Sequence, residues 1–207
     1  MPPHYWVYAR PSVPMESGCT GARTTLQCVK QSGSFYGAVY VSLTIGRYWG
    51  QIGYGWVREA MPFWMRSMFF QGVPISPTES LPFPPAPLPD SLHSFSIEKQ
   101  SNGLWSFRVD GAAFSNYSLD LKDQELIWSD SAILSAEAIS KVWTMKPILA
   151  SPAIEYRVGG LWTPADGATA GGDKIKWGVE GKLQNGSLLP NQLRIGSNIG
   201  VQSGRLF

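Results

Sequence analysis

Charged residues are scarce in this chain. Of its 207 residues only 15% are Asp, Glu, Lys or Arg, the formal net charge is +2, and no block of Lys or Arg occurs. Proteins that bind nucleic acids or anionic membranes carry a clustered basic surface. We therefore expect neither a nucleic acid nor a membrane as a partner, and the sequence leaves the oligomeric state open.

Long apolar runs are missing as well. No segment approaches the length that spans a bilayer, and the first four residues, Met1 to His4, have neither the basic nor the apolar region of a signal peptide. This pattern indicates either a protein whose signal peptide has been removed or a cytosolic one.

Histidine occurs only at His4 and His93, and the motifs of the common hydrolases are absent. There is no Gly-x-Ser-x-Gly elbow, no His-Glu-x-x-His, no carboxylate-rich calcium loop, no phosphate loop and no dinucleotide fingerprint. The sequence therefore predicts no cofactor and no metal. His93 lies at the start of an expected strand, where a structural hydrogen-bonding role is the usual one.

The chain has two cysteines, Cys19 and Cys28, which enclose eight residues rich in Gly and Thr. A disulfide across a hairpin or an Ω-loop can close this spacing, whereas a metal site would need further ligands that are not nearby. We expect one intramolecular disulfide, and with it an oxidising compartment and a secreted protein.

What the chain does contain is strand signals from end to end, with no convincing long helix. They recur at 5–10, 38–57, 63–70, 93–99, 104–110, 153–158 and 174–179. A chain of this length builds one well-buried core without having to split. The sequence predicts a single all-β domain over residues 1–207, a two-sheet antiparallel β-sandwich.

The clearest element is a β-hairpin over residues 38–57. Apolar and polar residues alternate along it, and a Gly46-Arg47 turn pairs Ile45 with Tyr48 and Ser42 with Gln51. One face is aliphatic. The other carries Tyr40, Ser42, Trp49 and Gln51 beside glycines, which predicts a polar and aromatic groove.

A second hairpin covers residues 93–111. Matching its faces favours a three-residue loop, Ser101-Asn102-Gly103, with Gly103 in the left-handed conformation, so that Phe95 pairs with Val109. Between the two hairpins, residues 72–90 hold seven prolines. Such a stretch cannot be a central strand, and we expect an ordered loop over the rim of the sandwich.

Residues 130–143 fit two structures. Their alternation favours a strand, while their Ala and Glu content with Ser129 or Asp130 as a cap also suits a helix. We predict a strand, because the neighbouring segments are strands. Glu137 then stands between two alanines, where desolvation would raise its pKa and suit it to general acid or base chemistry. The alternative is a solvent-facing Glu137 with no such role.

A resemblance rests on these segments. Gly50-Gln51-Ile52-Gly53, the aromatic run Phe63-Trp64-Met65 and Ala136-Glu137-Ala138-Ile139 are similar in layout to the glutamic peptidases, the eqolisin and neprosin-type families. The resemblance implies a concanavalin-like β-sandwich in which a Glu activates water and a Gln orients it and stabilises the oxyanion. It implies catalytic roles for Gln51 and Glu137, which are 86 residues apart.

The sequence also departs from the eqolisin pattern. Its pI is about 8.5, no aromatic residue follows Glu137, and the segment 63–70 carries Arg66 without an acidic residue.

A second class of function fits the same groove. Nine Trp and eight Tyr in a weakly charged sandwich are typical of carbohydrate recognition, since a flat ring stacks on a sugar. We thus expect a concanavalin-like or jelly-roll sandwich that is either a peptidase-like hydrolase, acting on polypeptide, or a noncatalytic module that binds polysaccharide. In both cases the expected substrate-binding residues are Tyr40, Ser42, Trp49 and Trp64.

Overall fold

The structure is a computed structural model of the whole chain. It describes residues 4–11, 18–31, 36–45, 47–57, 63–70, 73–74, 79–81, 90–119, 132–139, 146–172 and 177–197. At 4–6, 36, 57, 63–70, 73–74, 79–81, 114–119, 132–139, 172, 177 and 197, the description covers the backbone and its pairing.

The described residues form β-strands, turns and short connections, and no helix. The strands are β1 (His4–Pro11), β2 (Cys19–Gln27), β3 (Tyr36–Ile45), β4 (Tyr48–Val57), β5 (Phe63–Phe70), β6 (Val73–Pro74), β7 (Glu79–Leu81), β8 (Leu92–Lys99), β9 (Trp105–Val109), β10 (Ala112–Leu119), β11 (Ala132–Ile139), β12 (Ile148–Ala150), β13 (Glu155–Val158), β14 (Leu161–Pro164), β15 (Ala168–Gly172), β16 (Trp177–Gln184) and β17 (Ser187–Ser197). The strand predicted within 130–143 is thus confirmed as β11.

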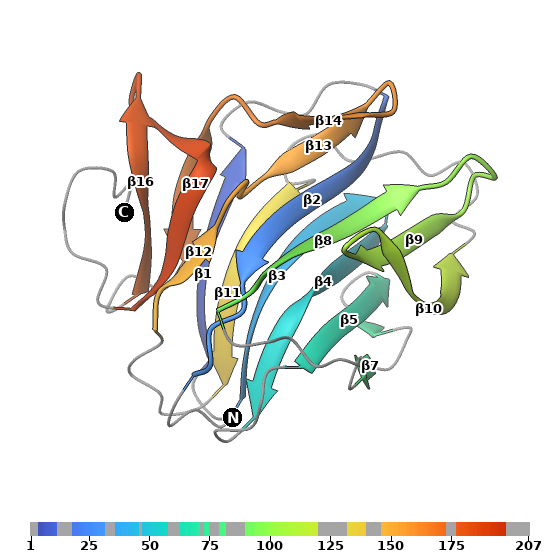
Figure 1. Cartoon of the computed structure of the whole chain (residues 1–207), viewed down its shortest axis with the longest axis horizontal. Helices are drawn as coiled ribbons and strands as arrows, with labels where there is room; N and C mark the ends of the chain where they lie inside the picture. Colours follow the sequence, from blue (N-terminus) through green and yellow to red (C-terminus); the bar gives the residue numbers. More distant parts are fainter. Residues whose placement is uncertain are drawn as a thin grey trace.

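The strands pair antiparallel and build two layers (Figure 1). An inner layer has the order β5-β4-β3-β11-β1-β15, with β6 and β7 pairing with β5. An outer layer runs from β10 through β9, β8 and β2 to β13 and β14, and through β12 to β17 and β16. The predicted antiparallel β-sandwich is confirmed.

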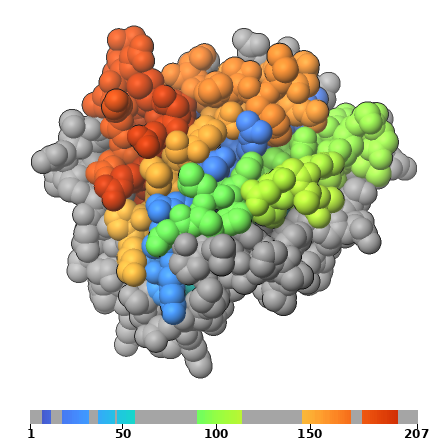
Figure 2. Space-filling model, in the orientation of Figure 1, coloured from blue at the N-terminus to red at the C-terminus, as the bar shows by residue number. Residues whose placement is uncertain are grey.

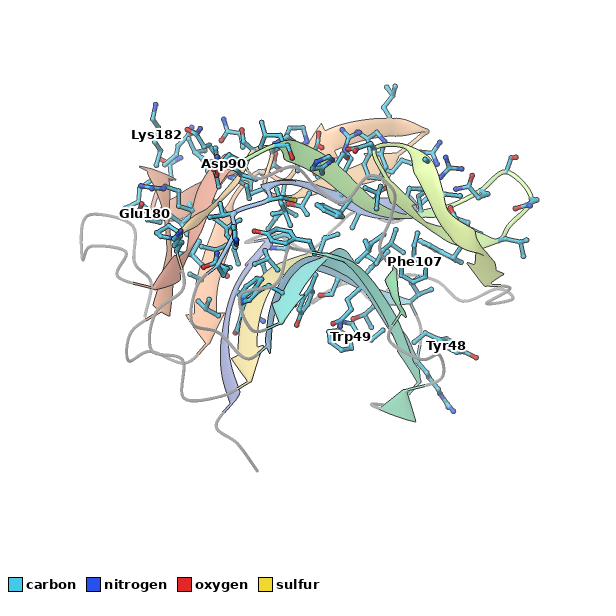
Figure 3. The ribbon with its side chains drawn as sticks, turned by 60° about the horizontal axis from the view of Figure 1, so that its bottom comes forward. Tyr48, Trp49, Asp90, Phe107, Glu180 and Lys182 are labelled. Atoms are coloured by element: carbon cyan, nitrogen blue, oxygen red, sulfur yellow. The ribbon has the colours of Figure 1, made fainter. Side chains whose placement is uncertain are left out.

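The core lies between the layers because both contribute apolar faces of period two. On the inner side Val39, Val41 and Leu43 of β3 are fully buried, and the outer side supplies Phe95 and Phe107. Figure 3 shows Phe107 between the two layers and the inner sheet arched beneath the outer one.

Tyr54 of β4 ties the layers together. Its ring stacks on Phe95, with centroids 6.5 Å apart, and its hydroxyl donates to the carbonyl oxygen of Gln27 at 3.0 Å. The same hydroxyl accepts from the Val29 amide at 3.2 Å. A polar group that crosses the core is therefore satisfied at the outer sheet, and it holds β4 in a fixed position below β2.

Both predicted hairpin registers are confirmed. Ile45 pairs with Tyr48 and Ser42 with Gln51 in the first hairpin. In the second, Phe95 pairs with Val109, and Gly103 has the predicted left-handed conformation, with φ +82°. The faces assigned from alternation are therefore the faces of the structure.

The proline-rich segment 72–90 lies mostly outside the described residues. Its described parts, β6 and β7, pair with β5 at the end of the inner sheet. The predicted rim loop and the single-domain organisation stay predictions. Within the described part of the chain, no helix is long and apolar enough to cross a membrane.

Candidate functional site

The face of β3 and β4 turned away from the core forms the candidate site. Because the side chains of a strand alternate between faces, β3 turns its odd-numbered residues to the core and Ala38, Tyr40 and Ser42 to the other side. Trp49 and Gln51 join this second face from β4. Figure 3 shows Trp49 under the arch of the inner sheet, on its concave side.

Gln51 is the unusual residue of this face. It is only 5% exposed, and its side-chain oxygen Oε1 is buried without a hydrogen-bond partner among the described residues. It lies opposite Ser42, which is 1% exposed. A half-turn of the terminal torsion exchanges the amide oxygen and nitrogen, so this position can present either an acceptor or two donors to a bound molecule.

Tyr40 and Trp49 form a small aromatic cluster beside Gln51. Their rings meet edge to face, with centroids 6.4 Å apart and an interplanar angle of 73°. With Ala38 they make an apolar cluster that is separate from the main core. The concave face therefore combines a buried amide with two packed aromatic rings.

Gly53 allows β3 and β4 to lie unusually close together. It lies opposite Tyr40, and a Cβ atom at this position would clash with the carbonyl oxygen of Val39. Real Cβ atoms do not approach backbone oxygen so closely, so only glycine allows β3 and β4 to pass at this distance. Because Gly53 has no side chain, the concave face has only backbone atoms at the position opposite Tyr40.

Glu137 enters the same face through strand pairing. In the register of β11 and β3, position 137 lies opposite Ala38, while Ser135 lies opposite Tyr40. Directly opposed residues of an antiparallel pair belong to one face. Positions 51 and 137 are therefore on one face of the inner sheet, separated by β3.

The two positions are not immediate neighbours. The residues that they oppose on β3, Ser42 and Ala38, are four apart, and two inter-strand steps separate β4 from β11. In a flat sheet this places their Cα atoms roughly 16 Å apart. The inner sheet is arched, and this face lies on the inside of the arch (Figure 3). Side chains on the concave side of a curved sheet point towards one another, so their ends are closer together than their Cα atoms.

The register of β5 decides the face of the inner sheet to which position 64 belongs. The register of β4 and β5 sets this position opposite Tyr54, a fully buried core residue. Position 64 therefore belongs to the core-side face, away from Gln51. The role in substrate binding expected of Trp64 finds no support in this register; Ser67, opposite Gln51, is the residue that β5 brings to the concave face.

Strand β1 also contributes positions to the concave face. Its register with β11 sets Trp6 opposite Glu137 and Tyr8 opposite Ser135, so both positions belong to the concave face. Val7 is buried in the core. Because residues alternate between the two faces of a strand, the positions on either side of it, Trp6 and Tyr8, belong to the opposite face. What the sequence did not supply was the pairing of β1 with β11.

The expected disulfide between Cys19 and Cys28 is not formed. Neither cysteine is in a disulfide and both are buried, Cys19 at the start of β2 and Cys28 directly after its end. Eight residues of extended chain lie between them and hold them about 30 Å apart, whereas a disulfide requires Cα atoms within about 7 Å. The segment is a central strand and not a closed loop, so the cysteines give no argument for an oxidising compartment.

The other strand carboxylates are held by arginines. Glu155, 6% exposed, accepts from Nε of Arg23 at 2.6 Å. Glu98 lies between Arg108 and Arg157, each at 3.0 Å. These ion pairs belong to the outer sheet, whose face is the one seen in Figure 2. Glu98 and Glu155 are thereby occupied in structural contacts on a different layer from Gln51.

His93 has hydrogen-bonding partners on both ring nitrogens. Nε2 lies 2.7 Å from the hydroxyl of Ser91, and Nδ1 lies 2.7 Å from a carboxylate oxygen of Asp110. Asp110 also accepts from the backbone amide of Ser94 at 2.8 Å. The imidazole thus joins the start of β8 to the end of β9 on the outer layer. In the described part of the chain, no group of three or more His, Cys, Asp or Glu residues is arranged to hold a metal ion.

Comparison with known proteins shows a similarity of fold to solved structures at low sequence identity. No protein-family model matches the sequence, and no curated protein matches it. Among solved structures, Scytalido-glutamic peptidase with a peptide-based transition state analog is similar, with a TM-score of 0.63, 9% identity, and coverage of 93% of this chain and 98% of that one. SCP-B, an eqolisin in complex with the tripeptide Ala-Ile-His, has a TM-score of 0.57, 12% identity and the same coverages.

Glucanase sandwiches match less well. The laminarinase catalytic domain from Thermotoga maritima has a TM-score of 0.43 at 11% identity, over 94% of this chain and 78% of that one. The resemblance to the glutamic peptidases extends over nearly the whole length of both chains. This chain therefore has the β-sandwich fold that the structures of glutamic peptidases also have.

Proposed function

We propose that this protein is a peptidase that hydrolyses peptide bonds with a water molecule activated by Glu137 and a substrate oxygen bound by Gln51. The observation that carries the proposal is the buried amide of Gln51 on a concave face, with an oxygen that lacks a partner in the described structure. The fold shared with Scytalido-glutamic peptidase, which was solved with a peptide-based transition state analog, supports the same chemistry.

The chemistry needs one carboxylate and one amide. The Glu137 carboxylate removes a proton from water as the water oxygen attacks the peptide carbonyl carbon. The carbonyl electron pair moves onto its oxygen, which accepts a hydrogen bond from the Gln51 side chain. When the tetrahedral species collapses, the C–N bond breaks and the proton on Glu137 passes to the leaving amine.

The separation of the two positions agrees with this division of roles. A span of roughly 16 Å between Cα atoms in a flat sheet is long for two side chains that hold one water directly. It suits two long side chains that flank a water and a carbonyl group together. Gln51 and Ser42 are nearly closed to solvent, so a substrate must displace the atoms that cover them.

Enclosure affects the energetics of the same step. A hydrogen bond to a developing negative charge is stronger where water is excluded and the local dielectric is low. An amide fixed in that environment needs no reorganisation as the charge forms. The buried position of Gln51 is therefore compatible with a catalytic role.

The test is hydrolysis of an unfolded protein substrate between about pH 2 and 6. A Glu/Gln mechanism uses neither metal nor a nucleophilic side chain, so cleavage should persist with chelators and with serine- or cysteine-directed inhibitors present. Absence of cleavage over this whole range, or its abolition by a chelator, would contradict the proposal. Because an enzyme active in acid works away from a neutral cytoplasm, secretion is part of the proposal.

A second candidate function is carbohydrate binding without catalysis. The aromatic pair of Tyr40 and Trp49 beside an amide favours it, because rings stack on sugars and amides bind hydroxyl groups. It predicts no turnover at any pH, together with retention on an immobilised polysaccharide that Trp49→Ala abolishes. Peptide hydrolysis by the wild type with no such retention would exclude it.

A further inference from the structure

Tyr40 lies at the centre of the concave face. On β3 it stands between Ser42, which opposes Gln51, and Ala38, which opposes Glu137. Tyr40 is two residues from Ser42 and two from Ala38. Because residues two apart on a strand share a face, all three lie on the concave face. No other residue of β3 lies on this face between them.

Its ring leans towards Gln51. Tyr40 opposes Gly53 on β4, which is four residues from Trp49, or about 13 Å along the strand. The two ring centroids are nevertheless only 6.4 Å apart. The rings therefore incline towards each other across the position of Gln51, which lies midway between Trp49 and Gly53 on the same face.

The ring is also held firmly. Tyr40 is 2% exposed, and Gly53 offers no side chain that would push the ring away. Edge-to-face aromatic packing contributes about 0.5–1.5 kcal/mol beyond burial. A group fixed in this way acts without losing conformational entropy at the moment of reaction.

From this geometry we propose that Tyr40 is a catalytic residue whose phenol, together with the Gln51 amide, donates a hydrogen bond to the oxygen of the scissile carbonyl. The inference rests on the proposed function. The phenol transfers no proton: it donates to the oxygen as the carbonyl electron pair moves there and keeps its own hydrogen when the C–N bond breaks. An ordinary phenol stays protonated far above the acidic range, so it is a neutral donor throughout it.

The experiment is steady-state kinetics of Tyr40→Phe on a peptide that the wild type cleaves. Phe keeps the ring and its packing on Trp49 and removes only the hydroxyl. We expect kcat to fall about 100-fold, as for loss of one oxyanion donor, with KM within about twofold and an unchanged midpoint of thermal unfolding. The matched control is Tyr48→Phe, which makes the same change on the core-side face of the same hairpin and should leave kcat unchanged.

Three results would overturn the inference. If Tyr40→Phe has the wild-type kcat and KM, the phenol takes no part, although the proposed peptidase function stands. If KM rises while kcat is unchanged, Tyr40 only binds substrate. If the wild type itself cleaves no peptide, the proposed function fails and this inference fails with it.

Discussion

The Gln51 side chain is a buried polar group whose oxygen has no hydrogen-bond partner in the described structure. Buried positions of a sheet usually carry apolar side chains, and polar side chains usually face solvent. A buried acceptor without a partner costs about 1–3 kcal/mol relative to one that is hydrogen-bonded. Such a cost is characteristic of sites where a ligand completes the bonding. Replacing Gln51 should therefore abolish activity without lowering the free energy of unfolding.

Gln51→Met tests this separation. Methionine has a similar length and no polar atom, so it removes the unpaired oxygen while keeping the volume. We expect the free energy of unfolding to stay the same or to rise by up to about 1 kcal/mol, measured by urea denaturation. A loss of 2 kcal/mol or more would show that the Gln51 amide stabilises the fold through its own contacts.

At the residue scale the sequence was informative where alternation and a short turn act together. The register of Gln51 with Ser42 followed from period-two alternation and a two-residue turn, and the structure has it. Cys19 and Cys28 were misjudged because a Thr-rich segment between two cysteines resembles a closed loop. Its alternate burial, with Ala22, Thr24 and Leu26 at 0% exposure, marks a central strand.

The elements β3 and β4 owe their close approach to Gly53. Gly53→Ala places a methyl group in a clash with the carbonyl oxygen of Val39, which cannot move without disturbing the ladder. We expect a loss of about 1–3 kcal/mol, as for overpacked cores. Gly103→Asn is the control: it has open space around it and a left-handed φ that Asn tolerates, so its cost should stay under about 1 kcal/mol. Equal losses at the two positions would contradict the steric account.

The pairing of strands that lie far apart in the sequence could not be predicted from the sequence. The face of Trp64 depends on how β5 aligns with β4, and the five residues between these strands do not determine that alignment. The approach of β11 to β3 joins segments about ninety residues apart, and no local pattern specifies it. For this reason position 137 could be placed on the face of Gln51 only by the register.

The whole molecule is predicted to lose stability in alkali. Burial raises the pKa of the Cys28 thiol well above its usual value of 9.0, with the charge of Asp110 adding to the effect, and burial chiefly raises that of Tyr54 above 10.0. Above about pH 9 the unfolded chain loses these protons while the folded chain keeps them. The unfolded state then binds fewer protons, so stability falls as pH rises, by about 1.4 kcal/mol per pH unit for each group.

Urea unfolding at pH 8, 9 and 10 measures this slope, and Cys28→Ala isolates the part that belongs to the thiol. In that variant the decline should begin about one pH unit higher, where Tyr54 alone contributes. Below pH 8 both groups are protonated in both states, so they should give no pH dependence there. An identical alkaline slope in the variant and the wild type would show that the Cys28 thiol does not control it.

The central claim for the molecule is that one carboxylate and one amide, brought to one concave face by pairing through β3, hydrolyse peptides. Its most direct test is kcat/KM for peptide hydrolysis in acid by Glu137→Gln and by Gln51→Met, beside the control Glu180→Gln, whose residue pairs with Arg194 on β17. We predict losses of about 1,000-fold in each of the first two, wild-type activity in the control, and cooperative unfolding in all three. Wild-type turnover in either Glu137→Gln or Gln51→Met would contradict the account.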